Sequence, residues 1–123
     1  MELKLKIYLV DGNQEKFMGI GVLWLLQEIS CVGSIRSAAA NLGISYSKAF
    51  SMLKTLEKDL DLQILERRRG GEAREGAVLT SSGIKLIELY DEFQQDVKHY
   101  AQNIFIDFKD TLKKELEYGD VSL

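Results

Sequence analysis

The side chains that most often carry catalysis are scarce in this sequence. The 123-residue chain contains one histidine, His99, and one cysteine, Cys31. A catalytic triad or a soft-ligand metal cluster needs several such side chains together, so neither can form within one chain. The glycine-containing stretch 70–76 lacks the Gly-Lys-Ser/Thr ending of a phosphate-binding P-loop. We therefore predict no enzyme activity, no catalytic residue, no metal and no cofactor.

Hydroxyl and lysine side chains gather in residues 45–54, and their chemistry suits DNA. Hydroxyls donate to or accept from base edges, and lysine or arginine reaches phosphate or guanine. A helix in which Ala49 and Leu53 face the core exposes the opposite face, with Phe50 bordering both. For each single residue the alternative is an ordinary solvated position. The predicted DNA contacts here are Ser45, Tyr46, Ser47, Lys48, Ser51 and Lys54.

The most basic stretch follows shortly afterwards, as Arg67-Arg68-Arg69 and then Arg74. A run of like charge is usually a solvated face. On a hairpin directly after a helix that reads DNA, it favours phosphate contacts instead, so we predict that these four arginines and Arg36 also bind DNA.

The net charge of −3 at first disfavours a nucleic-acid partner, but the charges are unevenly distributed. Residues 33–75 hold eight lysines or arginines against six acidic residues, and the acidic excess lies in the flanks. Phosphate binding depends on local charge, so a mildly basic centre is compatible with DNA.

Two short helices position these residues. Ser34 is a good N-cap for a helix over 35–42, and Gly43 can end that helix in the left-handed conformation. The next helix, over 46–59, follows after about three residues. This spacing predicts a helix–turn–helix over 34–59, with an ordinary helical hairpin as the alternative.

The flanking segments predict strands and one apolar helix. Residues 3–10 alternate partly and predict a strand, and residues 19–32 predict a helix that ends at Gly33. Beyond the helix–turn–helix, weak alternation and a glycine-containing loop predict a β-hairpin, or wing, over 62–80.

A long final helix is predicted over 82–118, with Thr80 or Ser81 as its cap and Gly119 after its end. It would measure roughly 55 Å, too long to pack wholly on so small a domain. The apolar residues at spacings of three and four beyond its first turns therefore predict a dimer interface. These residues are Tyr90, Phe93, Val97, Tyr100, Ile104 and Phe108.

The sequence resembles a known family. Residues 34–66 look like the winged helix–turn–helix of LysR-type regulators, through SIRSAAANLGIS and the later Leu56-Glu57. The resemblance is closer to the N-terminal domain of ModE-type, molybdate-responsive repressors, and it covers about residues 3–105. It rests on GISY at 43–46, Glu66-Arg67, Gly70-Gly71 and GAVLT at 76–80. The resemblance implies a dimer with the third helix in the major groove and the wing on the flanking backbone.

Two departures from that family bear on function. The loop of the wing reads Glu72-Ala73-Arg74-Glu75, where the family is usually glycine-rich, and the added acids weaken the case for wing contacts. The molybdate sites of ModE-type repressors lie in additional C-terminal domains, so the resemblance implies a stand-alone form and we expect this chain to bind no molybdate.

We predict a mainly α, α+β fold in which residues 1–123 form one winged helix–turn–helix domain, with an N-terminal strand and a long C-terminal dimerisation helix. The predicted function is a transcription regulator that binds a pseudo-palindromic DNA site as a homodimer. The alternative is a winged-helix protein-interaction or dimer-scaffold module without DNA binding. One cysteine and no run of 18 apolar residues favour a cytoplasmic protein without a membrane span.

Overall fold

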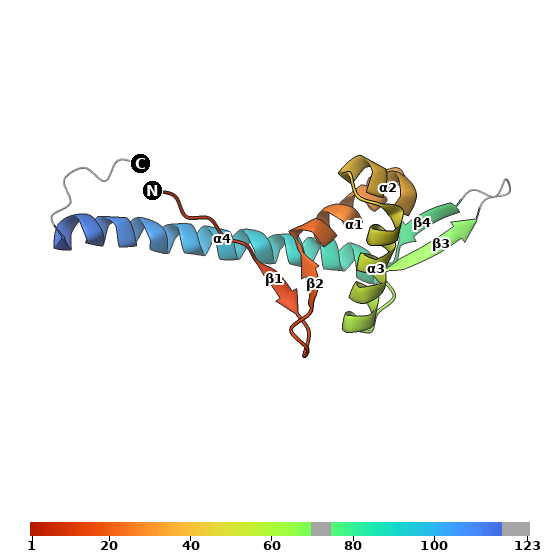
Figure 1. Ribbon diagram of the computed structural model, residues 1–123, viewed down its shortest axis with the longest axis horizontal. Helices are drawn as coiled ribbons and strands as arrows, with labels where there is room; N and C mark the ends of the chain where they lie inside the picture. Colours follow the sequence, from red (N-terminus) through yellow and green to blue (C-terminus); the bar gives the residue numbers. More distant parts are fainter. Residues whose placement is uncertain (70–74, 117–123) are drawn as a thin grey trace. The chain divides into compact units, whose positions relative to one another are not determined.

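The computed structural model describes residues 1–69 and 75–116 and confirms a mainly helical fold with two small antiparallel sheets (Figure 1). The contacts divide the chain into a winged unit, Ile7–Asp91, and a helical unit made of residues 1–6 and the residues from 92 onward. The elements in chain order are β1 Tyr8–Val10, β2 Lys16–Gly19, α1 Ile20–Val32, α2 Ile35–Leu42, α3 Tyr46–Leu60, β3 Leu65–Arg69, β4 Glu75–Leu79 and α4 Ser81–Glu115.

The helix–turn–helix forms where local capping signals place it. The Ser34 hydroxyl accepts a hydrogen bond from the Ser37 amide at 2.9 Å, which begins α2, and Gly43 ends α2 with a φ of 71°. Ala38 and Ala39 are fully buried, and their small side chains allow α2 to pack closely against its neighbours. The turn therefore leads directly into α3.

Helix α3 begins at a second serine cap and buries one face. The Ser45 hydroxyl accepts from the Lys48 amide at 3.1 Å. Ala49, Leu53 and Leu56 lie in the core, as the apolar spacing predicts, whereas Met52, which the same spacing places on the buried stripe, is only partly buried. The opposite side of α3 remains available for a ligand.

The wing is tied to α3 by a carboxylate. One Glu57 oxygen accepts from the Ile64 amide at 2.8 Å and from the Leu65 amide at 3.3 Å. Strand β3 then pairs with β4 in antiparallel register, with Leu65 opposite Leu79. The Glu57 carboxylate thus links α3 to the start of β3.

Replacing Glu57 by alanine is expected to destabilise the protein by about 1.5–3 kcal/mol, because two amides of buried residues lose their acceptor. Urea unfolding should show a lower midpoint at an unchanged m-value. The control is Glu88→Ala, which removes an exposed carboxylate paired with Lys85 and should change stability by less than about 1 kcal/mol. Equal stability of the two variants would contradict this role for Glu57.

The N-terminal region differs from the strand predicted over 3–10. Only Tyr8–Val10 forms a strand, and it pairs with the unpredicted strand Lys16–Gly19. The turn between them is held by Asp11, whose carboxylate accepts from the amides of Asn13 and Glu15 at 2.8 and 3.0 Å. The strand is shorter than predicted because a ladder forms only where a partner strand lies alongside. We call β1 and β2 the N-terminal hairpin.

Helix α4 is capped by Thr80, as predicted. The Thr80 hydroxyl accepts from the Gly83 amide at 3.1 Å and donates to the Gln63 carbonyl at 2.7 Å, so the cap also ties α4 to the base of the wing. The helix ends at Glu115 rather than near residue 118, and Gly119 lies outside the described residues.

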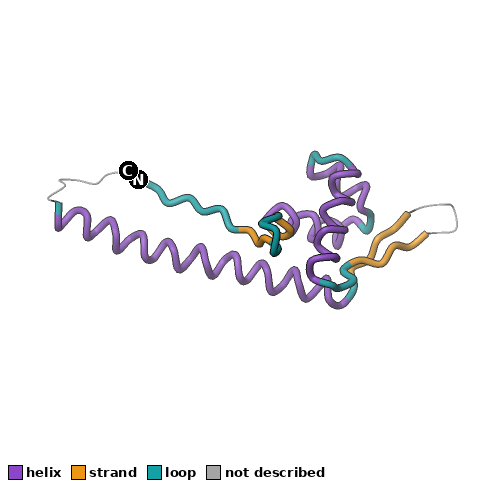
Figure 2. Tube along the Cα trace, turned by 60° about the horizontal axis from the view of Figure 1, so that its bottom comes forward, coloured by secondary structure: helices purple, strands orange, loops and turns teal. Residues whose placement is uncertain are grey.

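In the helical unit, residues 1–6 run beside the outer half of α4 (Figure 2). The Gln102 side chain donates to the Leu3 carbonyl at 3.3 Å. Another part of this half of α4 exposes large apolar side chains, among them Tyr100 at 69% and Ile104 and Phe108 at 52% each.

Candidate nucleic-acid interface

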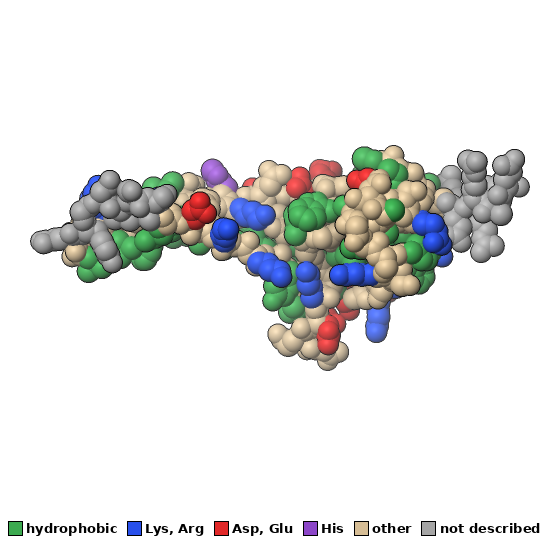
Figure 3. All heavy atoms as spheres, turned by 45° about the horizontal axis from the view of Figure 1, so that its top comes forward, with side chains coloured by type: hydrophobic (Ala, Val, Ile, Leu, Met, Phe, Trp, Pro, Cys, Tyr) green, Lys and Arg blue, Asp and Glu red, His purple; other side chains and the backbone are tan. Residues whose placement is uncertain are grey.

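The polar residues predicted on α3 lie at the surface of the winged unit. Ser47, Lys48, Ser51 and Lys54 are all exposed, and Ser45 is exposed at the helix start. In the space-filling view, lysine and arginine side chains occur on the face of the molecule that is drawn (Figure 3). Helix α3 therefore presents hydroxyls and ammonium groups together, as DNA contact requires.

Beside this face, two arginines and two aromatic rings form an arginine–aromatic cluster. The rings of Tyr46 and Phe50 stack with their centroids 6.1 Å apart. The Arg36 guanidinium carbon lies 4.4 Å from the Tyr46 centroid, and that of Arg67 lies 4.4 Å from the Phe50 centroid. Arg67 also donates to the Tyr46 hydroxyl at 2.9 Å. The cluster joins α2, α3 and β3 at one place.

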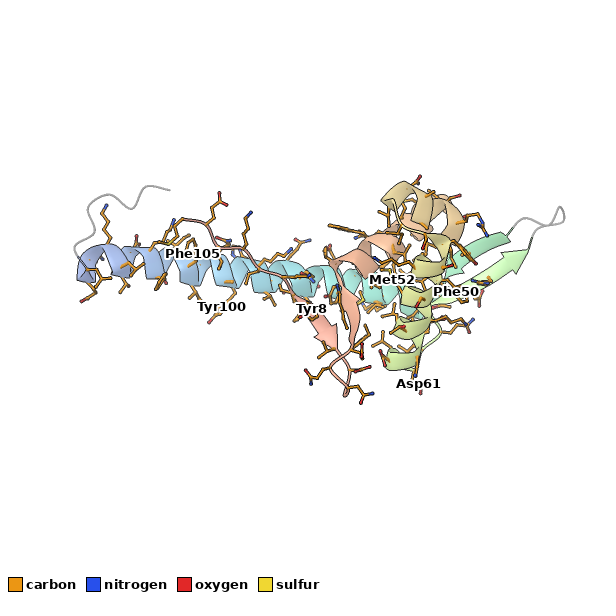
Figure 4. The ribbon with its side chains drawn as sticks, viewed as in Figure 1. Tyr8, Phe50, Met52, Asp61, Tyr100 and Phe105 are labelled. Atoms are coloured by element: carbon orange, nitrogen blue, oxygen red, sulfur yellow. The ribbon has the colours of Figure 1, made fainter. Side chains whose placement is uncertain are left out.

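The cluster holds the guanidinium groups in position. A planar guanidinium stacks well on a ring and keeps donors free for phosphate. The hydroxyl of Tyr46 accepts from one arginine and its ring lies under another, so its contacts favour a positioning role over base reading. Phe50 extends towards the wing side of α3 (Figure 4). Sequence reasoning left Phe50 undecided, although its spacing of four from Tyr46 was a visible signal.

The remaining wing arginines are described only in part. Arg68 and Arg69 belong to β3, but their side chains are not among those described. Arg74 lies outside the described residues. Their predicted phosphate contacts stay predictions.

Between α3 and the wing lies an open groove of about 530 Å³, which we call the wing groove. Its charged lining is mixed and contains Lys54, Arg67, Glu57 and Asp61. Within residues 1–69 and 75–116, no cluster of three or more histidine, cysteine or acidic side chains is arranged to hold a metal ion. None of the helices in the same ranges has the length and apolar character needed to cross a membrane.

Comparison with known proteins identifies the family. The model of the bacterial regulatory helix-turn-helix proteins of the LysR family matches residues 22–84, just over half of the chain. The chain belongs to the LysR family. The match runs from α1 through the wing to the start of α4, so it contains α3 and the arginine–aromatic cluster.

Relatives of this LysR-family chain include regulators named ModE. It is 37% identical over 75 residues to the transcriptional regulator ModE of Haemophilus influenzae, covering 61% of this chain and 29% of that protein. It is 39% identical over 71 residues to the DNA-binding transcriptional dual regulator ModE of Escherichia coli, covering 58% and 27%. The molybdenum-pterin-binding protein MopB of Rhodobacter capsulatus is 36% identical over 80 residues, covering 65% and 30%. The chain thus spans under a third of the length of each.

Two solved structures share the fold. The DNA-binding domain of CbnR in complex with DNA superposes with a TM-score of 0.59 at 21% identity, over 73% of this chain and 98% of that one. Full-length CbnR with its target DNA gives a TM-score of 0.55 at 22% identity, over 70% and 28%. The predicted winged helix–turn–helix and the resemblance to LysR-type and ModE-type proteins are confirmed. The matched family consists of regulatory helix-turn-helix proteins, and the Escherichia coli relative is a DNA-binding transcriptional regulator. That the chain binds no molybdate stays a prediction.

Proposed function

We propose that this LysR-family chain regulates transcription in the cytoplasm by binding a pseudo-palindromic DNA site as a homodimer. The observation that carries the proposal is the arrangement around α3. Its exposed hydroxyls and lysines lie beside two arginines that ring contacts hold in position. A ligand with base edges between two rows of phosphates complements both groups at once.

The first turns of α3 supply the base contacts in this proposal. A recognition helix enters the major groove and reads bases mainly through its N-terminal residues. Ser47 and Ser51 are exposed there, so their hydroxyls are accessible to base edges in the major groove. Arg36 and Arg67 then bind phosphates on the flanking backbone.

The homodimer rests on the outer half of α4. Tyr100, Ile104 and Phe108 follow one another at spacings of four and are exposed, and Phe93 is exposed on the same side by helical periodicity. A second copy of α4 would cover this stripe. The half-sites of a pseudo-palindromic site repeat about 34 Å apart on successive turns of the major groove, and the proposed dimer would place one α3 in each. Val97 is half-buried and remains in the proposed interface.

Tyr90 does not belong to this interface. Its side chain is 4% exposed and lies in the core of the winged unit. Sequence periodicity alone placed it on the stripe, but the early turns of α4 pack within their own domain. The predicted interface is corrected accordingly and begins beyond this residue.

Base contacts and phosphate contacts should fail differently. Ser47→Ala is expected to reduce the binding free energy for a duplex selected from a random library by roughly 1–3 kcal/mol. It should also relax the sequence preference. Arg67→Ala should weaken binding to selected and random duplexes by about the same factor and lower the salt slope by about one unit. Fluorescence anisotropy on both duplexes at several salt concentrations measures these effects.

Tyr46→Phe is the matched variant for the arginine–aromatic cluster, because it keeps the ring under Arg36 and removes only the acceptor of Arg67. It should resemble Arg67→Ala in kind but with a smaller effect. If Ser47→Ala and Arg67→Ala lose affinity in the same sequence-independent way, α3 does not read bases. If the parent protein shows no salt-dependent binding to duplex DNA, the protein-interaction alternative is correct.

A further inference from the structure

A second groove borders α3, and residues of β2 and α1 form the rest of its lining. Its volume is about 390 Å³, and we call it the hairpin groove because β2 forms one wall. Met52 points towards this side of α3, where α1 and β2 lie, whereas Phe50 points towards the wing (Figure 4). The lining residues are Lys16, Phe17, Gly21, Val22, Lys48, Ser51, Met52 and Thr55.

The two grooves that flank α3 differ in charge. The hairpin groove is lined by Lys16 and Lys48 and by no acidic residue, whereas the wing groove mixes both signs. Among the residues that the structure describes, neither lysine forms an ion pair. Thr55 of α3 lies in the same lining and carries a hydroxyl. A groove lined by two lysines without ion pairs and by no acidic residue favours an anionic ligand.

Lys16 is oriented by its surroundings. Its ammonium nitrogen lies 5.4 Å from the centroid of the Tyr8 ring. Its side chain crosses Gly19 so closely that a Cβ there would lie 2.9 Å from the Lys16 Cε. The Lys16 side chain thus packs on the N-terminal hairpin while remaining exposed to solvent.

We propose that Lys16, together with Lys48, binds the sugar–phosphate backbone of DNA on the side of α3 away from the wing. The inference rests on the proposed function and extends it, because a helix in the major groove has a phosphate strand on each side. The major groove of B-DNA is about 12 Å wide. In this arrangement Arg67 from β3 binds the phosphate strand on one side of the major groove. Lys16 from the N-terminal hairpin binds the strand on the other side.

This assignment also fits the charge of the protein. A chain with a net charge of −3 has little long-range attraction for DNA, so the phosphate contacts must come from clustered cations. The hairpin groove adds such a cluster outside the basic stretch 67–74 that sequence reasoning recognised.

The test compares Lys16→Gln with the parent protein by fluorescence anisotropy, on a duplex selected from a random library and on random duplex. Neutralising one phosphate contact lowers the salt slope by about 0.9. The affinity deficit of Lys16→Gln should therefore shrink roughly threefold between 50 and 200 mM salt, equally on both duplexes. Lys16→Arg should retain the parent slope.

The matched control is Lys85→Gln, which removes one exposed lysine of the same unit that lines neither groove. Its slope should equal that of the parent. Duplexes with one neutral methylphosphonate then locate the contact. At one phosphate position, the loss of affinity caused by the methylphosphonate and the loss caused by Lys16→Gln should not add. The position coupled in this way to Arg67 should be a different one.

Three results would overturn the inference. If Lys16→Gln keeps the salt slope of the parent while Arg67→Gln has a reduced salt slope, DNA is bound without the N-terminal hairpin. The proposed function would then stand. Equal slope losses in Lys16→Gln and Lys85→Gln would show a general effect of charge. Absence of salt-dependent binding by the parent would remove both this inference and the proposed function.

Discussion

Replacing Tyr100 and Ile104 by glutamate is expected to convert a dimer into a monomer and to weaken binding to a palindromic duplex by about 10²–10⁴-fold. Both side chains are more than half exposed in the single chain, so the substitutions should leave each winged unit folded. In a dimer, the carboxylates would be buried against a second apolar stripe without partners, which is strongly unfavourable. The affinity falls because the second half-site is no longer reached within one complex.

Light scattering at micromolar concentration measures the association state, and anisotropy measures binding to full and half sites. The control is the pair His99→Glu and Asn103→Glu, which adds negative charge at two exposed polar positions of the same helix. The control should remain dimeric. A monomeric parent protein, or a glutamate variant that keeps full affinity for the palindrome, would show that the stripe on α4 does not assemble the DNA-binding form.

Gly83→Ala is expected to destabilise the winged unit by about 1–3 kcal/mol, the range for overpacking a tight contact. A Cβ at this position would lie 2.5 Å from the carbonyl oxygen of Ile64 and 3.1 Å from its Cγ2 atom. Because the closer atom belongs to the backbone, a rotamer change cannot relieve the clash. The first turn of α4 must then move away from the base of the wing, which strains the bonds made by Thr80.

Thermal unfolding measures this effect, with an expected decrease in Tm of roughly 4–8 °C per kcal/mol for a domain of this size. Gly21→Ala is the matched control, since a Cβ at that position in α1 meets nothing within 4 Å. It should stabilise the helix by up to about 1 kcal/mol. If both alanine variants raise Tm, the close approach of α4 and the wing is not what requires glycine at 83.

The elements of this protein follow from short-range signals that can be read in the sequence. The serines at 34 and 45 cap α2 and α3 through amides three residues away, and Gly43 ends α2 in the left-handed conformation. The apolar spacing of α3 correctly assigns its buried face. Each of these signals acts within one or two helical turns, so the order and type of the helices could be predicted without knowledge of the packing.

Other features depend on residues that are far apart in the chain. Arg67 reaches Tyr46 across 21 positions, and Lys16 lines a groove with Lys48. Tyr90 has the same periodic spacing as the proposed interface residues, yet it is buried in the core. Periodicity states which side of a helix is apolar, but only the packed chain decides what covers it. The sequence by itself thus determined the helix–turn–helix and its polar face. The tertiary structure decided which cations flank that face, because β2 and β3 are distant from α3 in the sequence and lie beside it only in the packed chain.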